Sequence, residues 1–135
     1  MKYLLDTNSC IYIINKKPRK VLNRLRASEP GSVAISMIGI AELYYGAYRS
    51  DEAHRAKNLQ AVQLFLTPFA ALSFDENDAE QFGKLKALLR QHGTTLPDLD
   101  TAIAAQASTR KLVLVTNDIR HFKQVPGLKI DNWSD

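Results

Sequence analysis

Residues 3–8 read YLLDTN, a short apolar run that ends directly in an aspartate. Three further apolar runs follow at residues 33–35, 69–72 and 112–115, and the segments between them have helical patterns. Strands that alternate with helices form βαβ units, which build a parallel sheet with helices on both faces. The pattern therefore predicts an α/β fold, a three-layer α/β/α sandwich with a central parallel sheet.

The composition is that of one globular domain. With 135 residues, of which 45% are hydrophobic, we expect residues 1–135 to form a single domain. The one cysteine, Cys10, cannot form an internal disulfide, and Asp6 interrupts any secretory hydrophobic segment. The longest weakly polar stretch, 61–74, is shorter than the ~20 residues of a membrane span. We therefore expect a cytoplasmic protein without membrane contact, and the net charge of +4 favours a polyanionic partner.

Residues 74–90 have the pattern of a surface helix. Ser73 and Glu76 have the spacing of a capping box, acids lie in the first turns and basic residues lie towards the end. This distribution complements the helix dipole, so Asp75, Glu76, Asp78 and Glu80 are interpreted as structural acids.

Four other carboxylates lie in segments that are otherwise fit for burial, namely Asp6, Glu42, Asp100 and Asp118. Charged side chains are rarely buried unless they are paired, so these acids need an explanation. Three of them have a structural alternative: Asp6 can cap the helix that follows, Asp118 can belong to a turn, and Glu42 can pair with Arg49.

Asp100 is harder to explain structurally. Residues 95–98 already look like a capped helix start, with Thr95 as the cap and Asp98 at the third position of a capping box. Asp100 then shares a helix face with Ile103 and Ala107, which should face the core. A carboxylate on a core-facing stripe indicates a functional role.

Topology brings the four acids towards one place. Asp6 and Asp118 each follow an apolar strand, so both are expected at the carboxyl edge of the sheet, where open α/β folds bind ligands. Asp100 opens the helix that leads into the second strand, and Glu42 lies about two turns into another helix. Carboxylates in one cleft repel each other unless a cation intervenes, and oxygen ligands select Mg²⁺, with Mn²⁺ as a possible substitute.

The sequence therefore predicts a metal-dependent nuclease in which all four acids are catalytic and Asp6, Asp100 and Asp118 hold the metal. Polar residues near these acids are candidates for supporting roles. Thr7, Asn8 and Ser36 are expected to orient carboxylates or face a phosphate, although Thr7 and Asn8 can also cap a helix. Arg120 is placed to steer a phosphate, and Asp98 is an alternative metal ligand.

Two surface features have open interpretations. Between Asp6 and the next acid, which is Glu29, the chain has six cations that either track a nucleic-acid backbone or form a solvated helix face. They are Lys16, Lys17, Arg19, Lys20, Arg24 and Arg26. The tyrosines at positions 44, 45 and 48 can stack on unpaired bases, form a protein interface or pack in the core.

The motifs LLDTN (4–8), ISMIGIAELYYGA (35–47), PDLDTAIAAQA (97–107), LVTNDIRHF (114–122) and GLKIDNW (127–133), in this order, resemble the VapC-type toxins of the PIN-domain ribonucleases. The resemblance covers essentially the whole chain. It implies a sheet ordered 3-2-1-4-5 and a Mg²⁺-dependent endoribonuclease, with transfer RNA as the first expected substrate. It also implies a homodimeric toxin of a type II toxin–antitoxin system, with a VapB-type antitoxin through which alone it would reach operator DNA.

By matching position, the resemblance gives Asp6, Glu42, Asp100 and Asp118 the family's four acidic places, with Asp6 and Asp100 as the usual direct metal ligands. The chain departs from the family pattern at Gly39, where Thr is common. It departs again at His121, where an acid is frequent, and at Asp118, where many relatives have Asn. The alternative function is a non-catalytic module that binds an antitoxin or nucleic acid and whose acids are structural. An aspartyl phosphotransferase is disfavoured, because it expects an acid at position 8.

Overall fold

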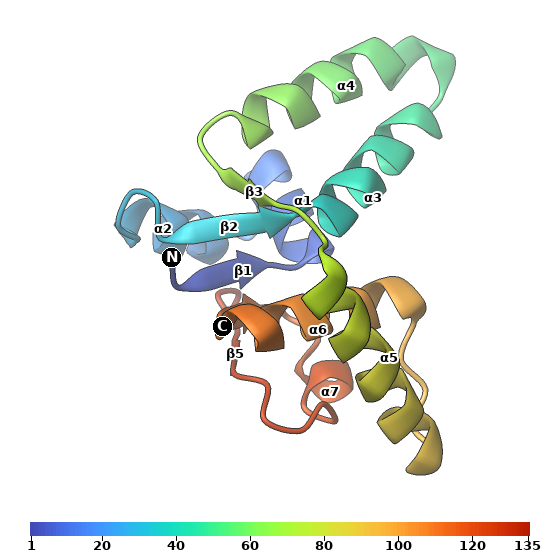
Figure 1. The fold of residues 1–135 in the computed structure, drawn as a ribbon. Helices are drawn as coiled ribbons and strands as arrows, with labels where there is room; N and C mark the ends of the chain where they lie inside the picture. Colours follow the sequence, from blue (N-terminus) through green and yellow to red (C-terminus); the bar gives the residue numbers. More distant parts are fainter.

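A computed structural model describes residues 1–135 and contains one sheet of five parallel strands in the order β3-β2-β1-β4-β5 (Figure 1). The strands are β1 (Tyr3–Leu5), β2 (Val33–Ser36), β3 (Ala70–Leu72), β4 (Val113–Val115) and β5 (Ile130–Asp131). Every pair of neighbours is parallel. The predicted α/β sandwich and the strand order implied by the family resemblance are both confirmed.

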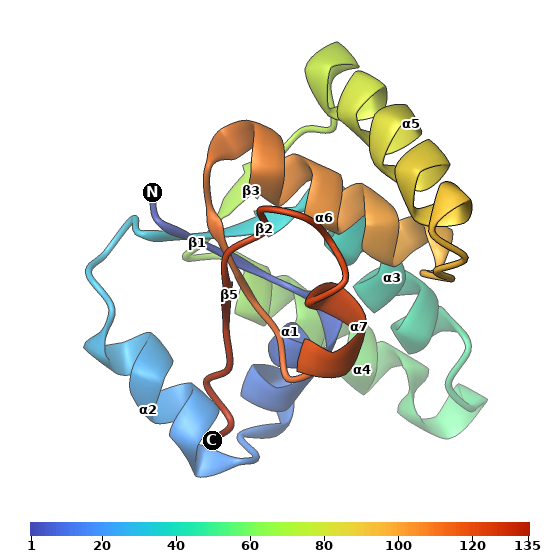
Figure 2. The ribbon, with the colours of Figure 1, turned by 90° about the horizontal axis from the view of Figure 1, so that it is seen from below.

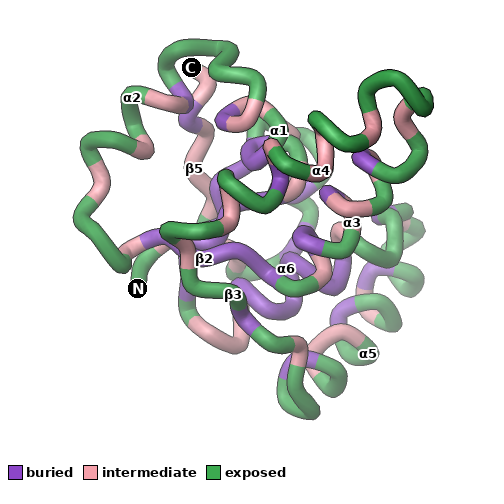
Figure 3. The backbone as a smooth tube through the Cα atoms, turned by 90° about the horizontal axis from the view of Figure 1, so that it is seen from above, coloured by how far each residue is buried: buried purple, intermediate pink, exposed green.

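Seven helices cover the sheet: α1 (Thr7–Asn15), α2 (Arg19–Ala27), α3 (Met37–Tyr48), α4 (Glu52–Leu66), α5 (Glu76–Gln91), α6 (Asp98–Arg110) and α7 (Ile119–Phe122). Side chains alternate between the faces of a strand, so Leu4 faces one core and Leu5 the other. The core around Leu4 lies against α5 and α6, and the core around Leu5 lies against α1, α2, α3 and α4. Figure 3 shows buried backbone along β2 and α6, and mostly exposed backbone on α2 and α4. No helix combines the length and the apolar character that crossing a bilayer requires.

The apolar runs located four of the strands to within one residue at each end. The predicted run 69–72 starts one residue before β3 does, and β2 continues one residue beyond the predicted run 33–35. The two residues of β5 are too few to produce a periodic pattern, and only the resemblance implied a fifth strand.

The predicted start of α5 is wrong by two residues. Its N-cap is Asp75, whose carboxylate accepts the Asp78 backbone N–H at 3.0 Å, while the Asp78 carboxylate accepts the Asp75 backbone N–H at 3.0 Å. These two bonds form a capping box with the predicted spacing, displaced from Ser73 and Glu76. Several acids near a helix start allow more than one register, and the structure selects the one that also pairs α5 with α6.

Asp78 is a structural acid of the helix start, as predicted, and it also has a role that the helix pattern did not predict. The residue is fully buried, its carboxylate lies 3.0 Å from the Arg110 guanidinium of α6, and the Thr109 hydroxyl donates to it. Burial on its own would raise the pKa of Asp78, but the hydrogen bonds from Thr109, the Asp75 backbone and Arg110 outweigh it and lower the pKa. Asp78 therefore ties α5 to α6.

The predicted capping of α6 is wrong as well, and the helix begins at Asp98, two residues later than a cap at Thr95 would place it. Pro97 precedes its first residue, and no side chain caps the helix. Asp98 instead forms an ion pair with Lys86 of α5 at 3.0 Å. The pairing could not be read from the sequence, because Lys86 is brought to Asp98 only by the packing of the two helices.

Candidate active site

Asp6 and Asp118 follow neighbouring strands at the carboxyl edge of the sheet. The strands β1 and β4 pair in register, with Leu5 opposite Val115, and the Asp6 backbone N–H donates to the Val115 carbonyl at 3.0 Å. Asp6 is buried, with 5% of its surface exposed, and its carboxylate accepts the Ser9 backbone N–H at 2.8 Å. Asp6 therefore caps α1, as the structural alternative proposed, and it also faces the region of the other acids.

Glu42 reaches the same region from α3. The Thr7 hydroxyl donates to Glu42 Oε1 at 2.6 Å, which joins the first residue of α1 to the middle of α3. The alternative pairing of Glu42 with Arg49 does not form, since the Arg49 guanidinium lies 5.8 Å from the centre of the Tyr45 ring. Glu42 is therefore oriented by a hydroxyl group and forms no ion pair.

Asp100 is half-buried on the first turn of α6, and Figure 2 shows this end of α6 near α3 and α7. Burial is the largest contribution that raises the pKa of Asp100 to about 6, and the negative charges of Glu42, Asp6 and Asp118 add to it. Their repulsion can raise the pKa of Asp100 only because the four acids lie close together. We call Asp6, Glu42, Asp100 and Asp118 the acid cluster.

The same causes act on Asp6. Burial raises its pKa and the charge of Asp118 raises it further, although hydrogen bonds from Thr116 and Ser9 oppose these effects. Cys10 lies beneath the acid cluster, and burial, followed by the charge of Asp6, raises the pKa of its thiol. The cluster therefore holds more negative charge than its own hydrogen bonds compensate.

Carboxylates that repel each other in this way fit a divalent cation, because positive charge among them would lower the pKa values that burial and repulsion raise. Their oxygen atoms suit Mg²⁺ or Mn²⁺ better than zinc. In this structure no three acidic, histidine or cysteine side chains lie close enough together to surround an ion. The acids are thus near enough to repel one another, but in this structure they do not form a closed set of ligands.

Thr116 belongs to the acid cluster, although it was missed in the sequence analysis. Its side chain is fully buried, lies close enough to Asp6 to oppose the rise in the pKa of that residue, and accepts the Asp118 backbone N–H at 2.9 Å. A threonine at the end of an apolar strand, two residues before an acid, was the signal that could have identified it. Thr116 links the two acids that follow neighbouring strands.

His121 contacts Asp118 on the outer side of the cluster. One ring nitrogen of His121 lies 2.7 Å from a carboxylate oxygen of Asp118, and both side chains are partly exposed. Nearby, the Asn117 side chain donates to the Tyr12 hydroxyl and so ties the β4–α7 loop to α1. These contacts hold the loop that carries Asp118.

The other predicted supporting residues have different positions. Ser36 is fully buried, and its hydroxyl accepts the Ile38 backbone N–H at 3.0 Å, so it caps α3 rather than orienting a carboxylate as predicted. Asn8 and Arg120 are exposed on α1 and α7, and their predicted contacts with a phosphate stay predictions. Asp98, the alternative metal ligand, is paired with Lys86 instead.

Gly39, where the chain departs from the family pattern, lies beside the acid cluster. A Cβ atom at this position would be 3.6 Å from the Thr7 hydroxyl oxygen and 3.8 Å from Ile35, both ordinary contact distances. A side chain there would therefore touch the hydroxyl that orients Glu42, and in this protein that hydroxyl has no such neighbour.

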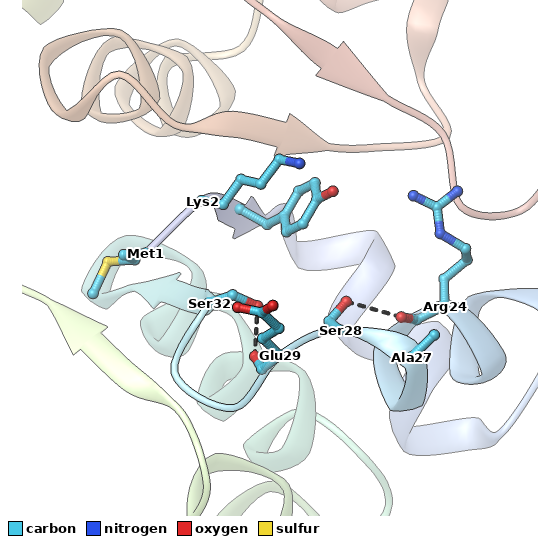
Figure 4. Close-up of a pocket in the computed structure, with 8 residues that line it drawn as sticks. Met1, Lys2, Arg24, Ala27, Ser28, Glu29 and Ser32 are labelled. Carbon is cyan, nitrogen blue, oxygen red and sulfur yellow. Dashed lines mark hydrogen bonds between the residues drawn. The ribbon is translucent and has the colours of Figure 1, made fainter.

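One cavity lies at the opposite edge of the sheet from the acid cluster. It has a volume of about 450 Å³ and is lined by the start of β1 and the end of α2, as Figure 4 shows. Hydroxyl groups of Ser28 and Ser32 on its wall donate to the backbone carbonyls of Arg24 and Glu29. None of the four acids lines this cavity.

Comparison with known proteins gives concordant results. Residues 3–128 match the family model of the PIN domain. The chain is 38% identical to "Ribonuclease VapC2" of Haemophilus influenzae, over 98% of both proteins. It is 37% identical to "tRNA(fMet)-specific endonuclease VapC" of Salmonella typhimurium, again over 98% of both.

Solved structures agree with these matches. The chain superimposes with a TM-score of 0.92 on a chain of the DNA-bound VapBC complex from Salmonella typhimurium, at 36% identity and 98% coverage of both chains. It superimposes with a TM-score of 0.91 on a chain of VapBC2 from Rickettsia felis bound to a promoter DNA fragment, at 35% identity, covering 98% of this chain and 99% of that one. The likeness therefore extends over the whole fold, including every element that contributes to the acid cluster.

Proposed function

Because this chain belongs to the PIN-domain family and, within it, to the VapC-type toxins, we propose that it is the toxin of a type II toxin–antitoxin system and cleaves structured RNA with the help of Mg²⁺. The observation that carries the proposal is the convergence of Asp6, Glu42, Asp100 and Asp118, whose repulsion contributes to raising the pKa of Asp100 to about 6. Transfer RNA is the first substrate to test, since relatives are named tRNA(fMet)-specific endonucleases.

Each acid has a proposed task in the hydrolysis of a phosphodiester bond. Asp6 and Asp100 would hold Mg²⁺, or Mn²⁺ in its place, and Asp118 would complete or orient the ligand set. The bound ion would supply a Lewis acid that polarises a phosphate oxygen and lowers the pKa of a water molecule. Glu42 would position or deprotonate the attacking water, and Thr7 keeps that carboxylate oriented through the 2.6 Å hydrogen bond.

The partner we propose is a VapB-type antitoxin, through which alone the toxin would contact operator DNA in the cytoplasm. The support comes from the similar structures, which are VapBC complexes, two of them bound to DNA.

We also propose a homodimer. Its support is a row of large exposed apolar side chains along α3, where Met37, Tyr45 and Tyr48 are 45%, 69% and 60% exposed.

The test is end-mapping of RNA cleaved by the wild type, by Asp6→Asn and by Glu80→Gln, which alters an exposed acid of α5 as a matched control. We expect the wild type and Glu80→Gln to produce ends with a 5′-phosphate and a 3′-hydroxyl in Mg²⁺, and Asp6→Asn to produce none. Cleavage that persists in EDTA or in Asp6→Asn would refute the proposal. A folded wild type that cleaves no RNA and is not stabilised by Mn²⁺ would favour the alternative of a binding module.

A further inference from the structure

A second cavity lies next to the acid cluster, on the other side of the first turn of α6. It has a volume of about 360 Å³ and is lined by α5, by the loop after it and by the start of α6. Its lining residues are Lys86, Leu89, Arg90, Gly93, Thr94, Thr95, Leu96, Asp98 and Thr101. In Figure 2 this loop lies at the same end of the molecule as α7 and the start of α3.

We propose that this cavity binds a backbone phosphate of the RNA, with its ribose, on a strand whose scissile phosphate lies at the acid cluster. The inference rests on the proposed function and names the part of the protein that holds the substrate beside the site of cleavage. We call the cavity the phosphate subsite.

The charges of the phosphate subsite favour an anion. Lys86 and Arg90 are one turn apart on α5, so their side chains lie on the same face of the helix. Asp98 is the only acid in the lining, which leaves a net charge of +1. Lys86 is held in place, because its ammonium lies 3.0 Å from Asp98 and 5.9 Å from the centre of the Phe82 ring. Arg90 forms no ion pair within the protein and is free to contact a phosphate.

The other lining groups combine hydroxyls with apolar surface, and a sugar–phosphate unit can contact both. Thr94 and Thr95 place two hydroxyl groups in the wall, while the Thr101 hydroxyl is already bonded to the carbonyls of Leu96 and Pro97. The apolar side chains of the lining are Leu89 and Leu96, which are almost fully buried, and aliphatic parts of the polar residues supply further apolar surface. The volume is within the range of ~300–1,000 Å³ that is common for small-ligand sites.

The acid cluster explains why a cationic subsite is needed nearby. Four carboxylates repel an RNA backbone, and most of the affinity of proteins for RNA comes from cations that neutralise phosphates. Asp98 and Asp100 lie two positions apart on α6 and so point to different sides of the helix, about one helix diameter, or ~10 Å, from each other. A strand that crosses the start of α6 can therefore occupy both places.

The experiment measures the affinity of a fluorescein-labelled 20-nucleotide RNA as a function of salt, without divalent ions and with Asp100→Asn as background so that no cleavage occurs. Lys86→Gln and Arg90→Gln should each weaken binding about threefold or more at 0.1 M salt. Each should also reduce the slope of log K against log salt by about 0.7, the value for one phosphate contact on a single strand. Asp98→Asn removes the acid of the subsite and should tighten binding.

Lys84→Gln is the matched control, because Lys84 is an exposed cation of α5 that does not line the cavity. Equal effects of Lys84→Gln and Lys86→Gln would overturn the proposal, as would weaker binding in Asp98→Asn. The proposal would also be overturned if Lys86→Gln and Arg90→Gln weakened the binding of inorganic phosphate but left the salt slope of RNA binding unchanged. The cavity would then bind a small free anion. Cleavage is scored separately in the Asp6→Asn experiment, so failure of the subsite and failure of the proposed function are distinguishable.

Discussion

Asp100 is the residue at which the demands of stability and of the proposed chemistry diverge most. Burial and three neighbouring carboxylates raise its pKa from 3.8 to about 6. The folded state therefore binds more protons than the unfolded state between these pH values, and ionisation of Asp100 lowers the free energy of unfolding as the pH rises from about 4 to 6. From about pH 7 upwards Asp100 is ionised in both states, so the loss no longer changes with pH.

Asp100→Asn removes this loss, so we expect the variant to be inactive and more stable than the wild type at pH 7.5, by on the order of 1 kcal/mol after allowance for solvent screening. Urea denaturation at pH 4 and pH 7.5 measures the difference in the free energy of unfolding between Asp100→Asn and the wild type. This difference should be small at pH 4 and should grow towards pH 6. A variant that retains cleavage, or whose advantage is largest at pH 4, would contradict the role assigned to Asp100.

Thr7 shows how a single hydroxyl can determine the orientation of Glu42, the carboxylate for which we propose a catalytic task. We expect Thr7→Val to lower the rate of RNA cleavage about 10- to 100-fold, because Glu42 loses the hydrogen bond at 2.6 Å that orients it. Single-turnover cleavage in Mg²⁺ measures the effect. Thr7→Ser keeps the hydroxyl and should restore most of the rate, and a rate as low as that of Thr7→Val in this variant would argue that packing, not the hydrogen bond, matters here.

At the scale of elements, α5 and α6 are held together by polar contacts that sequence patterns do not reveal. Asp78 is fully buried between Arg110 and Thr109. The Gln106 amide nitrogen donates to the carbonyls of Leu72 and Ser73, and so connects α6 to the end of β3. The position of α6, and with it the position of Asp100, depends on this network.

Asp78→Ala should lower the free energy of unfolding by about 2–3 kcal/mol, because a partly buried Arg110 and the Thr109 hydroxyl lose their partner. Urea denaturation at neutral pH measures the loss. Glu80→Ala, which removes an exposed acid two residues further along the same helix, should change stability by less than about 0.5 kcal/mol. Equal losses in the two variants would show that the carboxylates act only through the helix dipole.

At the scale of the whole molecule, the acid cluster is assembled by the parallel topology. The two central strands each deliver an aspartate to the same edge. The helix α6 begins at that edge before it leads back into β4, and α3 begins there where β2 ends. The exposed apolar row of α3 lies on the outside of this assembly, as expected for a surface that a second copy covers.

Tyr45→Asp should therefore convert a homodimer into a monomer, since a charge in an apolar interface is costly to desolvate. Sedimentation velocity measures the change, and the thermal shift produced by Mn²⁺ should persist because the acid cluster is within one protomer. Leu64→Asp places the same charge on an exposed leucine of α4 as a control. A dimer that survives Tyr45→Asp, or a wild type that is monomeric, would refute the proposed interface.

Much of the fold and part of the site were determined locally, and so could be predicted from sequence. Apolar runs marked the strands, helical periodicity placed Asp100 beside Ile103 and Ala107, and the position of Asp6 and Asp118 after strands required both to lie at one edge. Contacts between residues far apart in the chain were decided only by the packing of the helices. These are the bonds of Thr7 with Glu42, Asp78 with Arg110, Lys86 with Asp98, and the buried link through Thr116. Strand and helix patterns follow from neighbouring residues, whereas a polar side chain finds its partner only after burial has removed the water that would otherwise satisfy it.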